Sequence, residues 1–437
     1  MKKIISMILV CCMSFTVASS ISVAAPAMGA TLVEYGNISG LDGWNTGAPW
    51  RLYDDGTLFV GEGFVDQDES FSSPWSWYPL LDIYKIVFTG PVIAGESMSA
   101  LFANLPYLTA ICGLDFIDTS NVTDIHWLFN WSLGITKLDL SSWDVSNVTD
   151  MSVVFSNNAS LANLDISDWD TSSVVDMRAM FHRTHSLTHL DLSHFNTSNV
   201  RNMEAMFAVS NYLIELDLSN WDTSNVTTMQ SMFSNVSGLP YLDVSHFDTQ
   251  NVTDMTAMFN GMFSLTSLDL SEWDTSNVRR MWIMFSHAFN LTSLNLSGWD
   301  TRNVTTMDNM FQGTTALREL TLGEHFKFVE AWCDRNNIYE NAALPPAPNN
   351  YYFTGYWQNV GNGTVYNPQG EFVFTSDELM RYYDGSIHAG TWVWQPRRNV
   401  VDNDIINNAI NVIITYFDIN PDNIENIREF LARFLLR

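Results

Sequence analysis

Cysteine is scarce in this sequence, with four residues among 437. Cys11 and Cys12 belong to an N-terminal leader that we expect to be removed, which leaves Cys112 and Cys333. These two residues are separated by about eight periods of the repeat described below, and at ~4.8 Å per period they are too far apart for a disulfide. We therefore expect both to be buried as small apolar side chains, and we exclude a disulfide framework.

Positive charge is also scarce, since 20 Lys and Arg stand against 48 Asp and Glu and give a formal net charge of −28 at pH 7. Removing a leader that holds Lys2, Lys3 and no acidic residue takes this charge from −28 to −30. Such a surface repels nucleic acid, anionic lipid and anionic wall polymers. It favours a basic protein or glycan partner, or divalent cations.

Beyond the N-terminus the sequence lacks any apolar run near the ~20 residues that a membrane helix needs, and it lacks a Leu-Pro-x-Thr-Gly wall-sorting motif. Residues 1–30 have a basic start, an apolar stretch that reaches Val17, and a small-residue run at Ala24-Ala25-Pro26-Ala27, with cleavage expected between Ala24 and Ala30. This combination is typical of a secretory signal peptide. We therefore predict an exported bacterial protein that is secreted or associated with the cell surface.

Signs of catalysis are absent as well. Carboxylates abound, but no unique acid pair, nucleophile elbow or phosphate-binding loop interrupts the pattern. Chemistry needs a singular site in a shaped pocket, whereas repetition favours an extended recognition surface. We therefore predict that the protein is not an enzyme and that it needs no cofactor.

What the sequence does contain is one 26-residue repeat, which dominates the stretch from Leu138 to Arg318. A typical copy contains a Leu-Asp-Leu-Ser segment, which varies to Leu-Asp-Ile at Leu164, Leu-Asp-Val at Leu242 and Leu-Asn-Leu at Leu294, then an Asp-Thr-Ser-Asn-Val segment and a Met-Phe pair. The first leucines of the copies are Leu138, Leu164, Leu190, Leu216, Leu242, Leu268 and Leu294. The phenylalanines are Phe129, Phe155, Phe181, Phe207, Phe233, Phe259, Phe285 and Phe311. A fixed period of this length indicates a solenoid, in which each coil buries its apolar edge against its neighbours.

The predicted fold is a mostly β solenoid of the α/β, leucine-rich-repeat type with about eight coils. In Leu-Asp-Leu the two leucines alternate with an outward Asp, as in a strand. Asp-Thr-Ser-Asn has turn chemistry, Val-Thr-x-Met predicts a second short strand, and Met-Phe with the following polar residues predicts about one helical turn.

The flanks of the array differ from it in composition. Residues 31–97 predict short strands that cap the first end of the solenoid, which we place at 98–328. Residues 329–398, rich in Gly, Asn and aromatic residues, predict a second cap. Residues 399–437 carry two amphipathic helical stripes. Such a tail can dock on the solenoid, pair with another copy, or hold a wall or membrane partner.

The repeat resembles the 26-residue repeat of the BspA-like leucine-rich repeat proteins of bacterial surfaces. The motif that carries the resemblance is Leu-Asp-Leu-Ser-x-Trp-Asp-Thr-Ser-Asn-Val-Thr-x-Met-x-x-Met-Phe, and it covers about residues 98–325. The flanks around Trp50 to Gly63 and from Trp357 to Gln395 are similar to those of the family. The resemblance implies a surface-exposed or secreted protein that binds ligands on host or neighbouring cells and has no enzyme activity.

One outward column of carboxylates is the main candidate binding surface. It consists of Asp139, Asp165, Asp191, Asp217, Asp243 and Asp269. In register these carboxylates would lie ~5 Å apart and repel one another. Solvent and the serines two positions on can offset the repulsion. Alternatively, the column receives a basic protein segment, an amine-bearing polymer or divalent cations.

Three other columns have mainly structural interpretations. The column of Asp144, Asp170, Asn196, Asp222, Asp248, Asp274 and Asp300 favours Asx turns. The column of Asn147, Asn199, Asn225, Asn251, Asn277 and Asn303 favours ladders inside the same turns. The aromatic column of Trp143, Trp169, Phe195, Trp221, Phe247, Trp273 and Trp299 favours packing between coils, although it could also stack sugars.

Histidines interrupt the repetition at four nearby positions, namely His182, His185, His189 and His194, and again at His246. Their spacing could bring nitrogens near a metal. Because they fall on a predicted helical turn and a predicted strand, we assign no metal site to them. With Tyr241, the residues His189, His194 and His246 are variable positions beside the Asp column and join it as candidate ligand contacts.

We predict a non-enzymatic adhesion or ligand-binding protein that contacts its partner through the acidic solenoid face. One alternative is a carbohydrate-binding or carbohydrate-active solenoid, which would need an open aromatic groove. Burial of Trp221 and Trp273 would remove its sugar platform. A second alternative is a structural assembly subunit, which depends on the C-terminal helices.

Overall fold

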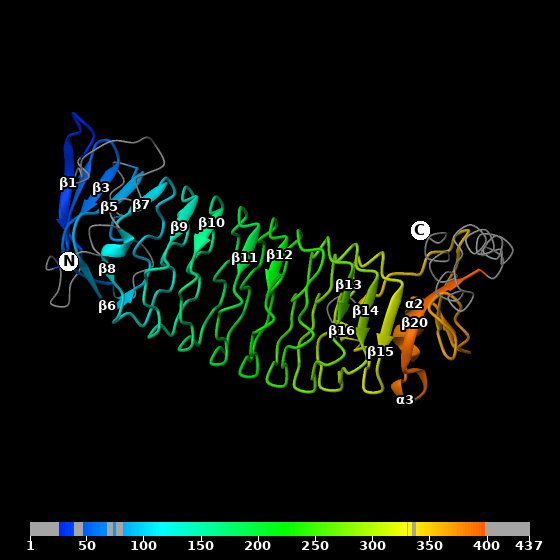
Figure 1. Ribbon diagram of the computed structural model, residues 1–437. Coiled ribbons are helices and arrows are strands. Elements are labelled where there is room, and N and C mark those ends of the chain that lie inside the picture. Colours follow the sequence, from blue (N-terminus) through cyan, green and yellow to red (C-terminus); the bar gives the residue numbers. More distant parts are fainter. Residues whose placement is uncertain are drawn as a thin grey trace, which may run out of the picture. The chain divides into compact units, whose positions relative to one another are not determined.

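The structure of the protein is a computed structural model that describes residues 26–38, 47–67, 73–75, 82–329, 331–333 and 338–397. The chain divides into two compact units, residues 1–240 and 241–437. Both contain parallel coils with a period of 26 residues, as the hydrogen bond from Ser132 to Asn158 illustrates (Figure 1). The fold is thus the predicted mostly β solenoid of the leucine-rich-repeat type. Most of the predicted signal peptide and the predicted helical tail lie outside the described residues.

In the first unit the Leu-Asp-Leu segments form short parallel strands. β9 (Lys137–Asp139) pairs with β10 (Asn163–Asp165), and β11 (His189–Asp191) pairs with β12 (Glu215–Asp217). Each residue lies opposite its equivalent in the next coil. The leucine points inward and its two neighbours point outward, because successive side chains in a strand face opposite sides. The predicted register is confirmed for these pairs.

A second row of contacts joins the Val-Thr-x-Met segments through isolated parallel bridges. In the first unit the bridged residues are Ser97, Asp124, Asp150, Asp176, Asn202 and Thr228. In the second unit Asp254 bridges Arg280, which bridges Thr306. The predicted second strand is therefore reduced to one bridged residue in each coil. This residue stands at position x of Val-Thr-x-Met, and the bridged residues of successive coils form a row within each unit.

The predicted helical turn after the Met-Phe segment is wrong. In its place the chain makes consecutive turns with left-handed residues four positions apart, such as Val153 (φ 63°) and Asn157 (φ 62°). The amide of Val153 donates to the carbonyl of Arg178 in the next coil at 2.7 Å. Alternate amides thus bond between coils, and this geometry outcompetes the i to i−4 bonds of a helix. A left-handed backbone conformation is energetically unfavourable for a β-branched residue such as Val153. The hydrogen bonds between stacked coils must therefore stabilise it.

The core of each coil is aromatic and sulfur-rich. In the first unit Phe129, Phe155, Phe181 and Phe207 are at most 1% exposed. Successive rings stack with centroids 5.6 to 5.8 Å apart. In the second unit Phe285 stacks in the same way on its neighbours in both directions. Methionines such as Met203 are also buried.

The N-terminal end combines a meander with the first, irregular coils. β1 (Leu32–Asn37), β2 (Pro49–Tyr53) and β3 (Thr57–Val60) are antiparallel. In the same sheet, β3 pairs parallel with β5 (Lys85–Phe88), and β5 pairs parallel with β7 (Ala110–Cys112). A second parallel sheet contains β4 (Gly63–Gln67), β6 (Val92–Met98) and β8 (Ile117–Asp118). The 3₁₀ turn η1 (Leu114–Phe116) directly precedes β8. Cys112 is half-buried, which corrects the predicted full burial, because β7 belongs to an irregular coil.

The second unit ends in an antiparallel module. Parallel strands β13 (Ser267–Asp269), β14 (Ser293–Leu296) and β15 (Glu319–Leu322) are followed by β20 (Gly390–Pro396), which pairs antiparallel with β15. β18 (Phe353–Asn359) and β19 (Val373–Phe374) extend this sheet, and β16 (Ala331–Cys333) pairs with β17 (Ile338–Glu340). β20 thus covers the open edge of the last coil, as expected of a cap.

Two short helices complete the module: α2 (Ser376–Tyr382) and α3 (Gly385–His388). A capping box between Thr375 and Glu378 starts α2. The Tyr383 hydroxyl donates to the carbonyl of Gly323 at 2.9 Å and so fastens the end of α2 to the last coil. Among the described residues, no helix has the length and apolar character required to span a membrane.

Candidate functional site

The predicted carboxylates lie on the surface of both units, and we call them the Asp face. Its residues are Asp139, Asp165, Asp191 and Asp217 in the first unit and Asp243 and Asp269 in the second, and all are exposed. Asp139 lies opposite Asp165, and Asp191 lies opposite Asp217. In the second unit Asp269 lies opposite Asn295, which in turn lies opposite Thr321. The face therefore ends in neutral side chains.

Serines two positions on hold these carboxylates in Asx turns. The Ser141 hydroxyl donates to Oδ1 of Asp139 at 2.8 Å, and the Ser193 hydroxyl donates to Oδ1 of Asp191 at 2.7 Å. The hydrogen bonds from Ser193 lower the pKa of Asp191, and those from Ser245 do the same for Asp243. The predicted serine partners are thus confirmed, and they favour the charged form of the face.

The described residues form no ion pair with Asp139, Asp165 or Asp191. Their ion pairs join His126 to Asp124, His189 to Glu215, Arg280 to Asp254 and Arg302 to Asp300. Serine neutralises none of the carboxylate charge. Two carboxylates ~5 Å apart repel by roughly 0.8 kcal/mol in water. Stacking of the coils must overcome this repulsion at each step of the face.

The predicted histidines do not converge. His189 is exposed and lies 3.8 Å from Glu215, whereas Nε2 of His194 donates to the carbonyl of Ile166 at 3.0 Å. Burial lowers the pKa of His182 to about 4, and the nearby charge of Arg183 adds to this effect. No group of metal ligands among the described residues includes these histidines.

Tyr241 and His246 lie beside the Asp face of the second unit. Tyr241 is 68% exposed, and its side chain hydrogen-bonds Asp243, which contributes to the lowered pKa of that carboxyl after the stronger effect of Ser245. His246 is exposed and packs edge-on against Phe247, with ring centroids 5.1 Å apart. Tyr241 is therefore an exposed aromatic side chain beside the Asp face.

The structural columns have the predicted interactions. Oδ1 of Asp144 accepts from the amide of Ser146 at 3.0 Å, and Oδ1 of Asp170 accepts from the amide of Ser172 at 3.0 Å. Nδ2 of Asn199 donates to the carbonyl of Ser172 in the preceding coil at 2.7 Å. Asx turns and asparagine ladders therefore account for both columns.

The aromatic column is buried, so it offers no sugar platform. Trp221 and Trp273 are 4% and 1% exposed. Their indole nitrogens donate to main-chain carbonyls of the preceding coil, at 3.2 Å to Leu192 and 2.8 Å to Val244. These residues join successive coils and are unavailable to a ligand.

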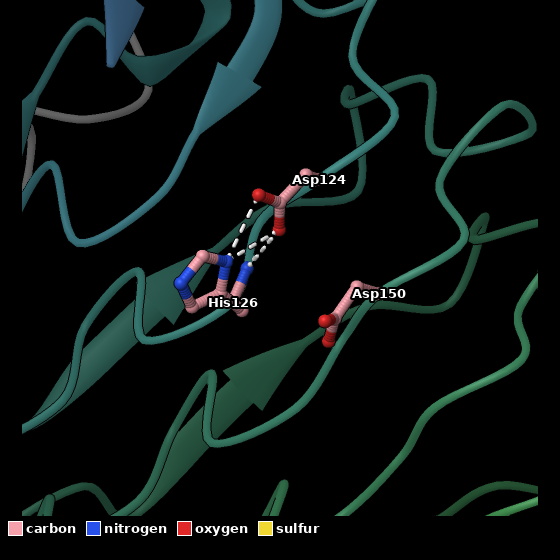
Figure 2. Close-up of side chains that lie close together, drawn as sticks. All are labelled: Asp124, His126 and Asp150. Atoms are coloured by element: carbon pink, nitrogen blue, oxygen red, sulfur yellow. Dashed lines mark hydrogen bonds and ion pairs between the residues drawn. The ribbon is translucent and has the colours of Figure 1, made fainter. Parts of the chain in front are cut away.

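A second carboxylate row, which was not predicted from the sequence, lies on the bridged segments. Asp124, Asp150 and Asp176 follow one another there, and all three are half-buried. His126 lies two residues after Asp124, and its Nδ1 approaches Oδ1 of that carboxylate at 2.7 Å. Figure 2 shows the imidazole turned toward Asp124, with Asp150 on the neighbouring coil.

Electrostatics couples the members of this row. The hydrogen bond with Asp124 raises the pKa of His126. Burial opposes ionisation of Asp124, but its hydrogen bonds with His126 outweigh burial and lower its pKa. Burial raises the pKa of Asp176, and the charge of Asp150 adds to the increase. The row therefore resists carrying full negative charge unless a cation lies beside it.

Asp124, His126 and Asp150 form the group that could hold a metal ion, since one ligand atom from each lies within 4.8 Å of the others. Imidazole and carboxylate are ligands for divalent ions such as zinc. Both nitrogens of His126 already have partners, because Nε2 lies 3.0 Å from the Ser99 hydroxyl. The sequence contained a pattern from which this row could have been predicted, because an Asp directly precedes the apolar residue at positions 125, 151 and 177.

Comparison with solved structures finds similar chains at low identity. One is the crystal structure of a leucine rich cell surface protein from Faecalibacterium prausnitzii A2-165, with 14% identity, a TM-score of 0.26, and coverage of 64% of this chain and 93% of that one. Another is TLR13 in complex with ssRNA13, with 14% identity, a TM-score of 0.19, and coverage of 61% and 54%. No curated protein sequence matches this chain.

The family described as "Mycoplasma protein of unknown function, DUF285" matches the repeats three times, at residues 96–213, 123–241 and 210–326. These overlapping matches span the coils that carry the Asp face and the Asp124 row. Together they cover more than half of the chain. This protein therefore belongs to the DUF285 family.

Proposed function

We propose that this protein is an exported, non-enzymatic binding protein of the BspA-like type, which acts in adhesion at the cell surface. Its Asp face receives a basic segment of a protein partner. The repeated, exposed carboxylates supply the recognition chemistry, and the rigid coils hold them in rows. A net charge of −28 steers such a partner toward the protein.

One observation carries this proposal: the carboxylates of Asp139, Asp165 and Asp191 are exposed and aligned with their neighbours, and no cation of the described residues pairs with them. A row of lysines or arginines on a partner would relieve the repulsion within the face. An extended basic segment suits this geometry, because its residues repeat at ~3.3 Å and can reach carboxylates ~5 Å apart.

The proposal can be tested with a variant that removes charge without disturbing the turns. Asn295 occupies an Asp-face position and accepts the same hydrogen bond, from the amide of Ser297 at 3.2 Å. The triple variant D139N/D165N/D191N should therefore fold. A matched control, D144N/D170N/D222N, changes the same charge in the second Asx column, where Asn196 occurs naturally.

Both variants and the natural protein would be used to capture partners from cell-surface extracts at low and physiological salt. We expect the Asp-face variant to lose the basic proteins that the natural protein and the control variant retain. Capture of the same proteins by all three would reject the Asp face as the contact.

A further inference from the structure

The second unit gathers positive charge at one place despite the acidity of the chain. Arg302, Lys327 and Arg381 line a pocket of about 350 Å³, together with Val304, Phe328 and Met380. This volume lies in the range of small-molecule sites. The three cations come from three separate segments: a turn of a late coil, the loop after β15, and the last turn of α2.

Hydrogen bonds fix two of these segments to each other. The Thr301 hydroxyl donates to the carbonyl of Lys327 at 2.7 Å and accepts from the amide of Lys327, also at 2.7 Å. On the neighbouring residue, the guanidinium of Arg302 binds both carboxylate oxygens of Asp300, at 2.9 and 2.6 Å. The backbone that carries the cations is therefore held in place before a ligand arrives.

The charge of the pocket is only partly balanced. Asp300 neutralises Arg302, whereas Lys327 and Arg381 take part in none of the ion pairs found among the described residues. Both side chains are exposed at the rim. Two cations that have no ion-pair partner among the described residues lie beside one pocket, and they match a phosphate monoester, which carries −1.5 to −2 charges at pH 7. An arginine fork and a lysine are the usual partners of this group.

The floor of the pocket is apolar. Val304, Phe328 and Met380 are each 5 or 6% exposed and lie beside the cations. Only the small exposed part of these side chains lines the pocket; an inorganic anion would leave it uncovered, whereas a ligand that joins a phosphate to an apolar group would cover it. We propose that this pocket binds a phosphate monoester attached to an apolar group, either as a soluble molecule or as a lipid headgroup.

Phenyl phosphate is a soluble probe with both features, and vesicles that contain phosphatidic acid in phosphatidylcholine are the membrane probe. Binding of phenyl phosphate to the full mature chain would be measured by calorimetry, and vesicle binding by co-sedimentation. The test variant is K327Q/R381Q. The control is K137Q/R201Q, which removes the same charge from exposed positions in the first unit.

We expect the natural chain to bind phenyl phosphate more tightly than inorganic phosphate, K327Q/R381Q to weaken that binding at least about tenfold, and the control to leave it unchanged. Binding of the acidic vesicles alone, lost in the same variant, would assign the pocket to a lipid headgroup. The proposal is overturned if neither probe binds the natural chain, or if the test and control variants behave alike. Circular dichroism of both variants would verify that they are folded.

Discussion

A substitution at His194 tests how tightly the coils are coupled through the aromatic column. Trp169 and Trp221 donate their indole N–H to carbonyls 29 positions earlier, at Leu140 and Leu192. Phe195 occupies the same column position and has no N–H. The residue before it, His194, donates from Nε2 to Ile166 at 3.0 Å, and Ile166 is the carbonyl 29 positions before residue 195. The histidine therefore replaces the indole as the link between these coils.

The size of the effect follows from this geometry. His194→Ala removes one hydrogen bond and an edge-on contact with Phe195, whose ring centroid lies 5.0 Å away. Because the side chain is exposed and water can reach the vacated site, we expect a loss of about 1 kcal/mol in the free energy of unfolding. In the protein that retains His194, Phe195→Trp should leave the free energy of unfolding nearly unchanged or lower it. In the His194→Ala background it should restore most of the loss, because the new indole supplies the missing donor.

Urea unfolding of the four proteins in this double-mutant cycle, followed by circular dichroism, measures the coupling. We expect a coupling of about 1 kcal/mol between positions 194 and 195. His189→Ala is the control and should change stability by less than about 0.5 kcal/mol, because His189 is exposed and its ion pair with Glu215, the one found for it among the described residues, is long at 3.8 Å. Additive effects at 194 and 195 would refute the idea that the histidine stands in for an indole.

Three further predictions concern the core and the titrating groups. Phe181→Ala should destabilise the protein by about 3–5 kcal/mol, because the ring is 1% exposed and stacked on both sides; a loss below about 1 kcal/mol in urea unfolding would contradict the stacked core. Burial lowers the pKa of His182 from 6.5 to about 4, so the unfolded state takes up its proton first, and stability should fall as the pH drops from 6.5 toward 4. His182→Gln should flatten this decline, and an unchanged pH profile would count against burial as the cause. Asp124→Asn should lower the pKa of His126 in an NMR titration, because it removes the carboxylate that raises this pKa; an unaltered titration would show that another group controls it.

The structural features that depend on the 26-residue period could be predicted from the sequence. A step of 26 residues places equivalent side chains opposite one another, so the register of Leu138 with Leu164 and the burial of Trp273 follow from it. The Asx turns follow from local chemistry, since an Asp side chain can reach the amide two residues on wherever the chain turns. These features need no knowledge of how neighbouring coils bond.

The errors arose where bonding between coils decides the local structure. Val153 lies in a segment that suggested a helical turn, but its amide bonds the next coil and the residue adopts a left-handed conformation. The Asp124 row was overlooked because its position in the motif also accepts Asn, Thr and Arg, which concealed the carboxylates. The pocket beside Arg381 lies between the last coils and α2, where the period no longer applies.

The most direct test of the central claim uses a short oligolysine peptide and the two triple variants. Fluorescence anisotropy would measure its affinity for the natural protein, for D139N/D165N/D191N and for D144N/D170N/D222N at physiological salt. If the aligned carboxylates form the binding surface, the first variant should bind several-fold more weakly, whereas the second should bind as the natural protein does. Equal weakening in both variants would show that only net charge attracts the peptide, and would contradict a specific acidic face.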